Sequence, residues 1–238
     1  MAEFLAPSEM IDCDHPKVRE FAAEAVRGAT SDTEKAVRIH DAVRDKVKFG
    51  FLGRFYEHKA SETLVGGRGF CNTKSALFTA ALRAEKIPAR IVYVDINTQI
   101  LKDCVAPGTP YVDHSYTEVY LNDRWIKTDS YILDKQLFDN AQSMLKRTGE
   151  TVGYGVHKNG TCEWDGHKDA FSQFVDDNEF PNLTTKTYGQ FKDVKDLYAS
   201  ESVTWNKLHA PVRVIFPLLA WVASTFSIDR IRSGKFPV

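Results

Sequence analysis

Gly66-Gly67-Arg68-Gly69-Phe70-Cys71-Asn72-Thr73-Lys74-Ser75-Ala76-Leu77 places a cysteine where a glycine-rich turn gives way to a helix. The glycines allow a sharp turn of the backbone, and the residues after the cysteine favour a helix with an apolar stripe. The thiol then lies among the unpaired N–H groups of a helix N-terminus, whose partial positive charge favours thiolate and can bind a developing oxyanion. We therefore expect Cys71 to be an accessible nucleophile of low pKa, the alternative being a small buried core residue.

The second informative segment, residues 114–129, predicts a β-hairpin. Strand-forming residues flank Asn122-Asp123, which suits a two-residue turn of the type that requires positive φ. With this turn Tyr116 lies opposite Asp129, so His114 and Asp129 become diagonal neighbours on one face, about 7–8 Å apart at Cα. A four-residue turn keeps this parity, whereas a turn of three or five residues breaks it.

Cys71, His114 and Asp129 together provide what nucleophilic thiol chemistry requires. The histidine takes the thiol proton and later gives it to a leaving group, while the carboxylate fixes the imidazole tautomer and stabilises its charged form. The sequence thus predicts a catalytic triad of these three residues. The alternatives are that His114 only begins a strand and that Asp129 only ends a hairpin.

With these residues in view, the chain resembles the transglutaminase-like superfamily, which includes transglutaminases, peptide N-glycanases and bacterial cysteine peptidase-like proteins. The motifs stand in the family's order: Gly-Arg-Gly-Phe-Cys71, the run from Ala81 to Val92, and His114 to Leu121 followed by Arg124-Trp125. The resemblance implies that Cys71 is the nucleophile, His114 the base and Asp129 the orienting acid.

The resemblance is clearest from about residue 60 to residue 134, with a weaker echo near Phe174. One departure concerns the acid, because Ser130-Tyr131 follow Asp129 where the family often has a proline and then a small residue. Asp134, a little downstream, is therefore the alternative acid.

The order of the predicted elements favours an α+β fold. Helices at residues 16–26 and 31–47 precede the catalytic helix, and a strand at residues 89–96 and the hairpin follow it. An antiparallel sheet would then pack against the catalytic helix, and the resemblance implies a transglutaminase-like or papain-like cysteine enzyme fold. We place the catalytic domain, with its N-terminal helices, at residues 1–180 and a C-terminal extension at residues 181–238.

The extension contains a strongly apolar stretch from Val212 to Ile228, interrupted by Arg213 and Pro217. It is shorter than the ~20 residues that span a bilayer, so we do not expect a membrane partner. An apolar helix that starts around Pro217 and packs on the same domain is favoured over a dimer contact or an interfacial anchor. The oligomeric state stays open.

Charge and cysteine usage narrow the possible partners. The formal net charge is −1 and the pI about 6.7, so we do not expect nucleic acid as a partner. The first residues lack a basic region followed by an apolar run, and the four cysteines are widely spaced, which fits reduced thiols in a cytoplasmic protein. A helix start at Pro16 explains Cys13 and His15 better than a metal site does, and we expect neither a metal nor a cofactor.

The other histidines and Trp164 receive structural interpretations. His40, on the helix that opens with the Ser31-x-x-Glu34 capping box, is interpreted as a flank of the core. Trp164 is interpreted as a core residue rather than a pocket wall. Four histidines lack partners at informative spacing and are interpreted as surface residues: His58, His157, His167 and His209.

We expect a cysteine-dependent acyl-transfer enzyme that acts on a peptide or small amide through a thioester on Cys71. Hydrolysis is the first choice, by analogy with small intracellular relatives. Transfer to an amine, as in a transglutaminase, an amide synthase or an arylamine N-acetyltransferase, stays open, although the last group has a glycine-rich segment where Lys127-Thr-Asp-Ser-Tyr stands here. The non-enzyme alternative is a transglutaminase-like module that binds a peptide without chemistry, for which no triad is needed.

Overall fold

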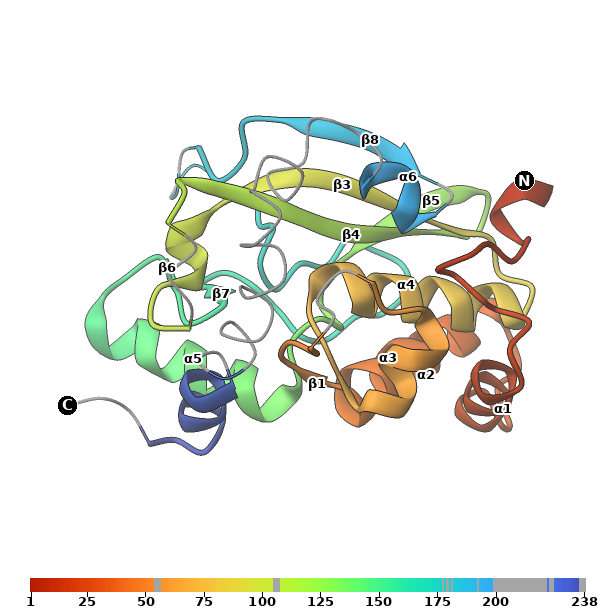
Figure 1. The fold of residues 1–238 in the computed structure, drawn as a ribbon, viewed down its shortest axis with the longest axis horizontal. Helices are drawn as coiled ribbons and strands as arrows, with labels where there is room; N and C mark the ends of the chain where they lie inside the picture. Colours follow the sequence, from red (N-terminus) through yellow and green to blue (C-terminus); the bar gives the residue numbers. More distant parts are fainter. Residues whose placement is uncertain are drawn as a thin grey trace.

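Helices and a four-stranded antiparallel sheet build the described part of the molecule (Figure 1). The computed structural model describes residues 1–53, 57–104, 108–176, 178, 180, 182–191, 193–198, 222 and 225–235. The strands of the main sheet lie in the order β5, β4, β3, β8. Their bounds are Ala89–Asn97 for β3, Tyr111–Leu121 for β4, Arg124–Thr128 for β5 and Thr187–Phe191 for β8.

Helix α4, Cys71–Ala84, lies against the sheet, and α1, α2 and α3 pack around it in turn (Figure 1). The other helical segments are α1 Pro16–Ala25, α2 Asp32–Lys46, α3 Ala60–Gly66, α5 Lys135–Thr148, α6 Val194–Tyr198 and the 3₁₀ turns η1 Ala2–Phe4 and η2 Thr98–Leu101. Two short strand pairs are β1 Lys48–Phe49 with β2 Arg68–Gly69, and β6 Val152–Gly153 with β7 Val156–His157. The predicted α+β fold, with an antiparallel sheet on the catalytic helix, is confirmed.

The helix starts follow the predicted caps. His15 is the N-cap of α1, and its Nδ1 accepts the N–H of Lys17 at 3.3 Å, with Pro16 as the first helical residue. Ser31 caps α2 by accepting the N–H of Glu34 at 3.1 Å. Both interpretations of these segments as helix starts are confirmed.

The hairpin has the predicted register. Asn122 and Asp123 form the turn with φ values of 50° and 62°, in the left-handed region that such a turn requires. Thr117 pairs with Thr128 and Leu121 with Arg124. One residue further on, Asp129 therefore falls on the same face as His114, as the parity argument requires.

Strand β4 extends beyond β5 at the end that bears His114. β5 pairs only with residues 117–121 of β4, whereas β3 pairs with residues 111–119. Among the described residues, positions 111–116 thus have no strand partner on the β5 side. The N-terminus of α4 reaches β4 in this part, because the amide of Asn72 donates to Asp113 at 2.7 Å.

Side chains alternate along β4 between the two faces of the sheet. Ser115 and Thr117 face α4, where their hydroxyls join Ser75 and Tyr131 in a buried network with O···O distances of 2.6–3.1 Å. His114 points to the opposite face, with the aromatic side chains that pack there. The hydroxyl network therefore lies on the face of the sheet that carries α4, and the imidazole of His114 projects from the other face.

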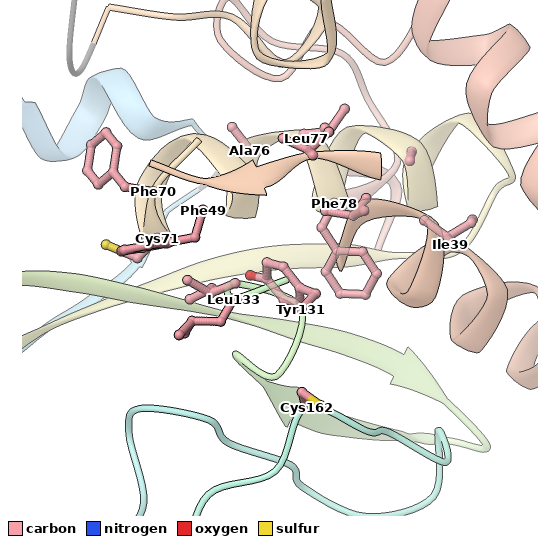
Figure 2. Close-up of a cluster of buried hydrophobic side chains, with 14 of the residues drawn as sticks. Ile39, Phe49, Phe70, Cys71, Ala76, Leu77, Phe78, Tyr131, Leu133 and Cys162 are labelled. Atoms are coloured by element: carbon pink, nitrogen blue, oxygen red, sulfur yellow. The ribbon is translucent and has the colours of Figure 1, made fainter. Parts of the chain in front are cut away.

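The main hydrophobic cluster surrounds α4. Every residue from Cys71 to Arg83 is buried, and the rings of Phe78 and Tyr131 meet beneath the helix with centroids 4.4 Å apart (Figure 2). Trp164 belongs to the same cluster, and its indole N–H donates to the carbonyl of Lys168 at 2.9 Å. The interpretation of Trp164 as a core residue is confirmed.

Two histidines lie deeper than their sequence context suggests. His157 is fully buried, so its interpretation as a surface residue is wrong; its backbone N–H donates to the carbonyl of Ser172 at 3.0 Å. His40 is also fully buried, and its Nε2 lies 2.8 Å from the hydroxyl of Ser130. Each also has a local partner, Asp41 for His40 and the N–H of Asn159 for His157. Ser130 and Ser172 come from other segments, which local spacing cannot reveal.

The last described residues bind the start of α5. Arg232 is 5% exposed, and its guanidinium donates to both carboxylate oxygens of Asp134 at 2.8–3.1 Å. It also donates to the carbonyl of Phe49 in β1 at 2.6 Å. Asp134 in turn is the N-cap of α5 and accepts the N–H of Leu137. A buried ion pair thus joins the C-terminal residues to the domain.

A second ion pair ties the same segment to the turn before the catalytic helix. Asp229 accepts from Arg232 and pairs with Arg68 of β2 at 2.9 Å. The predicted helix from around Pro217 lies mostly outside the described residues, and the division at residue 180 stays a prediction. No helix in the described ranges has the length and apolar character needed to cross a membrane.

Candidate active site

Cys71 is the first residue of α4, with Phe70 as its N-cap. The approach to it depends on Gly69, because a Cβ there would lie 2.8 Å from Thr73 Oγ1 and 2.9 Å from Lys74 Cγ. Thr73 Oγ1 accepts the N–H of Phe70 at 3.1 Å and fixes the turn. The sulfur therefore lies beside the first helical turn, whose N–H groups do not bond to backbone carbonyls of the helix.

The thiol of Cys71 is buried, and its pKa is raised. Its residue is 9% exposed, and burial raises the thiol pKa well above its usual range, with the Asp113 carboxylate raising it further. The N–H groups of Ser115 and Asn72 hydrogen bond to the sulfur and lower the pKa, but by less. The expectation of an accessible thiol of low pKa is wrong, because lost solvation of the thiolate outweighs the helix N-terminus.

Native-state alkylation tests this correction. All four cysteines are buried, so we expect iodoacetamide at pH 7 to label Cys71 more slowly in the folded protein than in the urea-unfolded protein. Labelling should rise with pH, because the thiolate fraction grows as pH approaches the raised pKa. Peptide mass spectrometry of the labelled sites gives the labelling rates. Faster labelling of Cys71 in the folded protein than in the unfolded protein would contradict the raised pKa and support the low pKa expected from the sequence.

His114 and Asp129 form a direct pair. Nε2 of the imidazole lies 3.1 Å from Asp129 Oδ2, and the two residues are 2% and 0% exposed. A carboxylate that already accepts several donors requires a proton on the nitrogen that faces it, so Nε2 donates and Nδ1 keeps its lone pair. Nδ1, the other ring nitrogen, takes no part in this contact.

The carboxylate of Asp129 is held by a distant segment. Oδ1 accepts the N–H of Ser172, the hydroxyl of Ser172 at 3.1 Å and the N–H of Gln173 at 3.3 Å. Oδ2, the oxygen that faces His114, accepts the N–H of Phe174 at 2.9 Å. Donors of this kind hold a carboxylate in one orientation.

Asp134, the alternative acid, has a different role. Its carboxylate accepts from Arg232 and from the N–H groups of Phe49 and Leu137. Burial would raise its pKa, but the hydrogen bonds and charge of Arg232 lower it below the usual range. Because these groups occupy Asp134 at the start of α5, the acid beside His114 is Asp129.

Cys71 and the histidine–aspartate pair lie on neighbouring elements without a direct link. Within the described residues no hydrogen bond joins Cys71 Sγ to the imidazole of His114. The sulfur instead receives the N–H of Ser115, the residue that follows His114 on β4. Contacts between nucleophile and base are often long in an unliganded site and shorten once substrate binds.

Asn72 and Asp113 accompany the thiol and are absent from the sequence-based interpretation. The amide oxygen of Asn72 lies 3.5 Å from Cys71 Sγ, and its nitrogen donates to Asp113 Oδ2 at 2.7 Å. Both residues are buried. An amide and a carboxylate therefore lie beside the sulfur in addition to the predicted triad.

Gly160 supports the segment that holds Asp129. A Cβ at this position would lie 2.5 Å from the carbonyl oxygen of Ser172, so a side chain there requires the backbone at Ser172 or Gly160 to shift. The weak resemblance near Phe174 is the only sequence signal that marks this segment, and it indicates no role for it. Backbone amides carry no residue-type signature, which is why the segment could not be assigned in advance.

Gly160→Ala is expected to destabilise the protein by about 1–3 kcal/mol, as overpacking against fixed backbone does. If the backbone at Ser172 is the part that shifts, the Asp129 donors should move with it. Urea denaturation measures the stability. Gly53→Ala is the matched control, since a Cβ there meets nothing within 4 Å, and an equal loss in both variants would contradict the prediction.

Comparison with known proteins finds that one family model matches the part of the chain that holds the site. The model of the Transglutaminase-like superfamily matches residues 19–130, a range that includes Cys71, His114 and Asp129. The resemblance predicted from the sequence is therefore confirmed, together with its fold, and it supports a cysteine-type enzyme. No curated protein matches the chain.

Two solved structures are similar to part of this chain. A "putative cysteine protease" from Cytophaga hutchinsonii is 23% identical with a TM-score of 0.43, over 52% of this chain and 39% of its own. A "putative protease" from Parabacteroides distasonis ATCC 8503 is 13% identical with a TM-score of 0.36, over 47% of this chain and 22% of its own. The chain thus spans less than half the length of either protein.

Proposed function

We propose that the transglutaminase-like superfamily domain at residues 19–130 catalyses acyl transfer from an amide through a thioester on Cys71. The observation that supports this most is the buried contact between His114 Nε2 and Asp129 Oδ2, 3.1 Å long. His114 precedes Ser115 on β4, and the N–H of Ser115 reaches the sulfur of Cys71. A histidine oriented by a carboxylate is the base that a neighbouring thiol needs to become a nucleophile.

The reaction starts from the protonated thiol. As the sulfur of Cys71 attacks the amide carbonyl carbon, Nδ1 of His114 accepts the thiol proton and Asp129 stabilises the imidazolium that forms. The N-terminus of α4, with its partial positive charge, stabilises the developing oxyanion. The imidazolium then gives its proton to the amine nitrogen, the C–N bond breaks, and the acyl group remains on sulfur.

A second nucleophile completes the cycle. In hydrolysis, His114 takes a proton from water as the water oxygen attacks the thioester, the C–S bond breaks, and the sulfur recovers the proton as the acid leaves. An amine in place of water would give a new amide. We favour hydrolysis of a peptide or small amide, which makes the chain a peptidase or amidase.

Intact-protein mass spectrometry tests the proposal. After incubation with peptides, small amides, esters and acyl-CoAs, we expect an acyl adduct on Cys71 in the wild type and none in Cys71→Ala or His114→Ala. An adduct that disappears in water with release of acid supports hydrolysis, whereas one that persists until a primary amine is added supports transfer. No adduct with any probe, in protein shown to be folded by circular dichroism, would reject the proposal.

Peptide binding without chemistry is the second candidate function. One observation favours it: Cys71 is 9% exposed and the pKa of its thiol is raised. If the chain is a binding module, the Cys71→Ser variant should still bind the peptide. The wild-type protein should then form no acyl adduct. The mass measurement therefore separates the two candidates.

A further inference from the structure

We propose that Phe174 is a positioning residue that holds the His114 imidazole on Asp129 by contacting both of them. The inference rests on the proposed role of His114 as a base. Phe174 lies 45 positions beyond Asp129 in the chain, and it belongs to the segment that supplies the Asp129 donors. It would act through His114 and would touch neither substrate nor sulfur.

Phe174 contacts the pair through two different parts. Its backbone N–H donates at 2.9 Å to Asp129 Oδ2, the same oxygen that lies 3.1 Å from His114 Nε2. Its ring stacks on the imidazole, with centroids 6.2 Å apart and an angle of 22° between the planes. The bond that orients the carboxylate therefore also places the ring beside the base.

Tyr116 fixes the Phe174 side chain in turn. Tyr116, two residues after His114 on the same face of β4, stacks on Phe174 at 5.6 Å and 24°. Phe171 meets Phe174 edge-on at 5.7 Å and Tyr116 edge-on at 5.6 Å. Phe174 thus bridges Tyr116 and His114, and its ring has little freedom to turn.

A stacked ring gives His114 what one hydrogen bond cannot. The terminal torsion of a histidine is broad, so a single bond from Nε2 leaves the plane of the imidazole free to tilt. The parallel ring of Phe174 limits this tilt and keeps water from the bond to Asp129, which strengthens the attraction between them. The lone pair of Nδ1 then keeps one orientation, the one in which it can accept the thiol proton.

Three variants isolate this role. Phe174→Leu removes the ring, and Phe174→Tyr restores it. Phe171→Leu is the matched control, because Phe171 lies in the same aromatic cluster and its ring contacts are with Tyr116 and Phe174. If Phe174→Leu does not fold, Phe174→Met, which keeps more of the side-chain volume, takes its place.

The first measurement is the rate at which an aryl acetate ester acylates Cys71. We expect Phe174→Leu to react about 10–100-fold more slowly than wild type, because a small misplacement of a catalytic group has effects of that size. Phe174→Tyr and Phe171→Leu should stay close to the wild-type rate. The comparison of the two leucine variants separates positioning from a general loss of packing.

The second measurement follows the His114 Nε2 proton by ¹H NMR and requires no substrate. A hydrogen-bonded imidazole proton that is protected from solvent exchanges slowly enough to be observed. The resonance is assigned to His114 if it is absent from the spectrum of His114→Ala. We expect the resonance in wild type, Phe174→Tyr and Phe171→Leu, and its loss by exchange with water in Phe174→Leu.

Retention of both the resonance and the acylation rate in Phe174→Leu would overturn the inference. Equal losses in Phe171→Leu would overturn it too, since they would indicate a weakened aromatic cluster rather than a specific contact. If the ester does not acylate the wild type, the proposed function fails, while the proton resonance still decides the role of Phe174.

Discussion

Asp129→Asn is expected to slow acylation of Cys71 by about 10⁴-fold while the chain remains folded, as loss of the orienting carboxylate does in a catalytic triad. An amide nitrogen facing His114 Nε2 cannot accept its proton, so the imidazole would protonate at Nδ1 and lose the base that the thiol requires. The carboxylate is fully buried and faces donors on both oxygens, so no water can replace it.

Asp134→Asn is the matched control for this prediction. Asparagine still caps α5, and the residue does not contact His114, so acylation per folded molecule should be unchanged. Single-turnover mass spectrometry at several times gives the rates, and circular dichroism gives the folded fraction. If only Asp134→Asn is slowed, the acid has been assigned to the wrong residue.

Arg232→Met is expected to lower the free energy of unfolding by about 3–5 kcal/mol, because it leaves a buried carboxylate without its charged partner. The side chains of Arg232 and Asp134 are 6% and 8% exposed, so solvent cannot compensate. Since the pair lowers the Asp134 pKa in the folded protein, its contribution is present above about pH 3.9 and is lost as pH falls below that value.

Two further variants test the Arg232 prediction. Arg230→Met, on the exposed side of the same helix, should change the unfolding free energy little. The double variant Arg232→Met with Asp134→Asn should recover much of the loss, because no unpaired charge remains and the cap is kept. Urea denaturation with an unchanged slope gives the differences. A loss in Arg230→Met equal to that in Arg232→Met would contradict the role of the ion pair.

Local signals were enough to predict the elements that build the site. The turn at Asn122-Asp123 follows from residues that accept positive φ, and once its length is known, the two-residue alternation of strands decides the face of every side chain in the hairpin. The contact between His114 and Asp129 is thus a consequence of one turn. The start of α4 at Cys71 follows similarly from glycines and helix formers.

The support of the site could not be predicted, because all but one of its donors are backbone groups. Any residue other than proline at 172, 173 or 174 supplies the same N–H to Asp129, so these N–H groups leave no pattern in the sequence. The close approach of Gly160 to Ser172 also leaves no sign in the sequence, because it exists only once the two segments pack together. Non-local contacts of this kind arise from the tertiary fold, not from local propensity.

The thiol of Cys71 illustrates a competition that sequence cannot decide. A helix N-terminus stabilises thiolate, whereas burial destabilises it, and only the packing of Cys71 against β4 determines which effect is larger. The helix start was visible in the sequence, but the depth of the sulfur was not. The same limit applies to His157, which is buried by contacts with a distant segment.

The ion pair between Asp134 and Arg232 also sets an order of events during translation. The two residues are 98 positions apart, and at about 5–20 residues per second the ribosome adds Arg232 about 5–20 s after Asp134. During that interval the nascent chain contains α4, the hairpin and the start of α5, but not the cation that neutralises the buried carboxylate. We therefore expect the ribosome-bound chain to form this ion pair only after the helix that contains Arg232 has been synthesised.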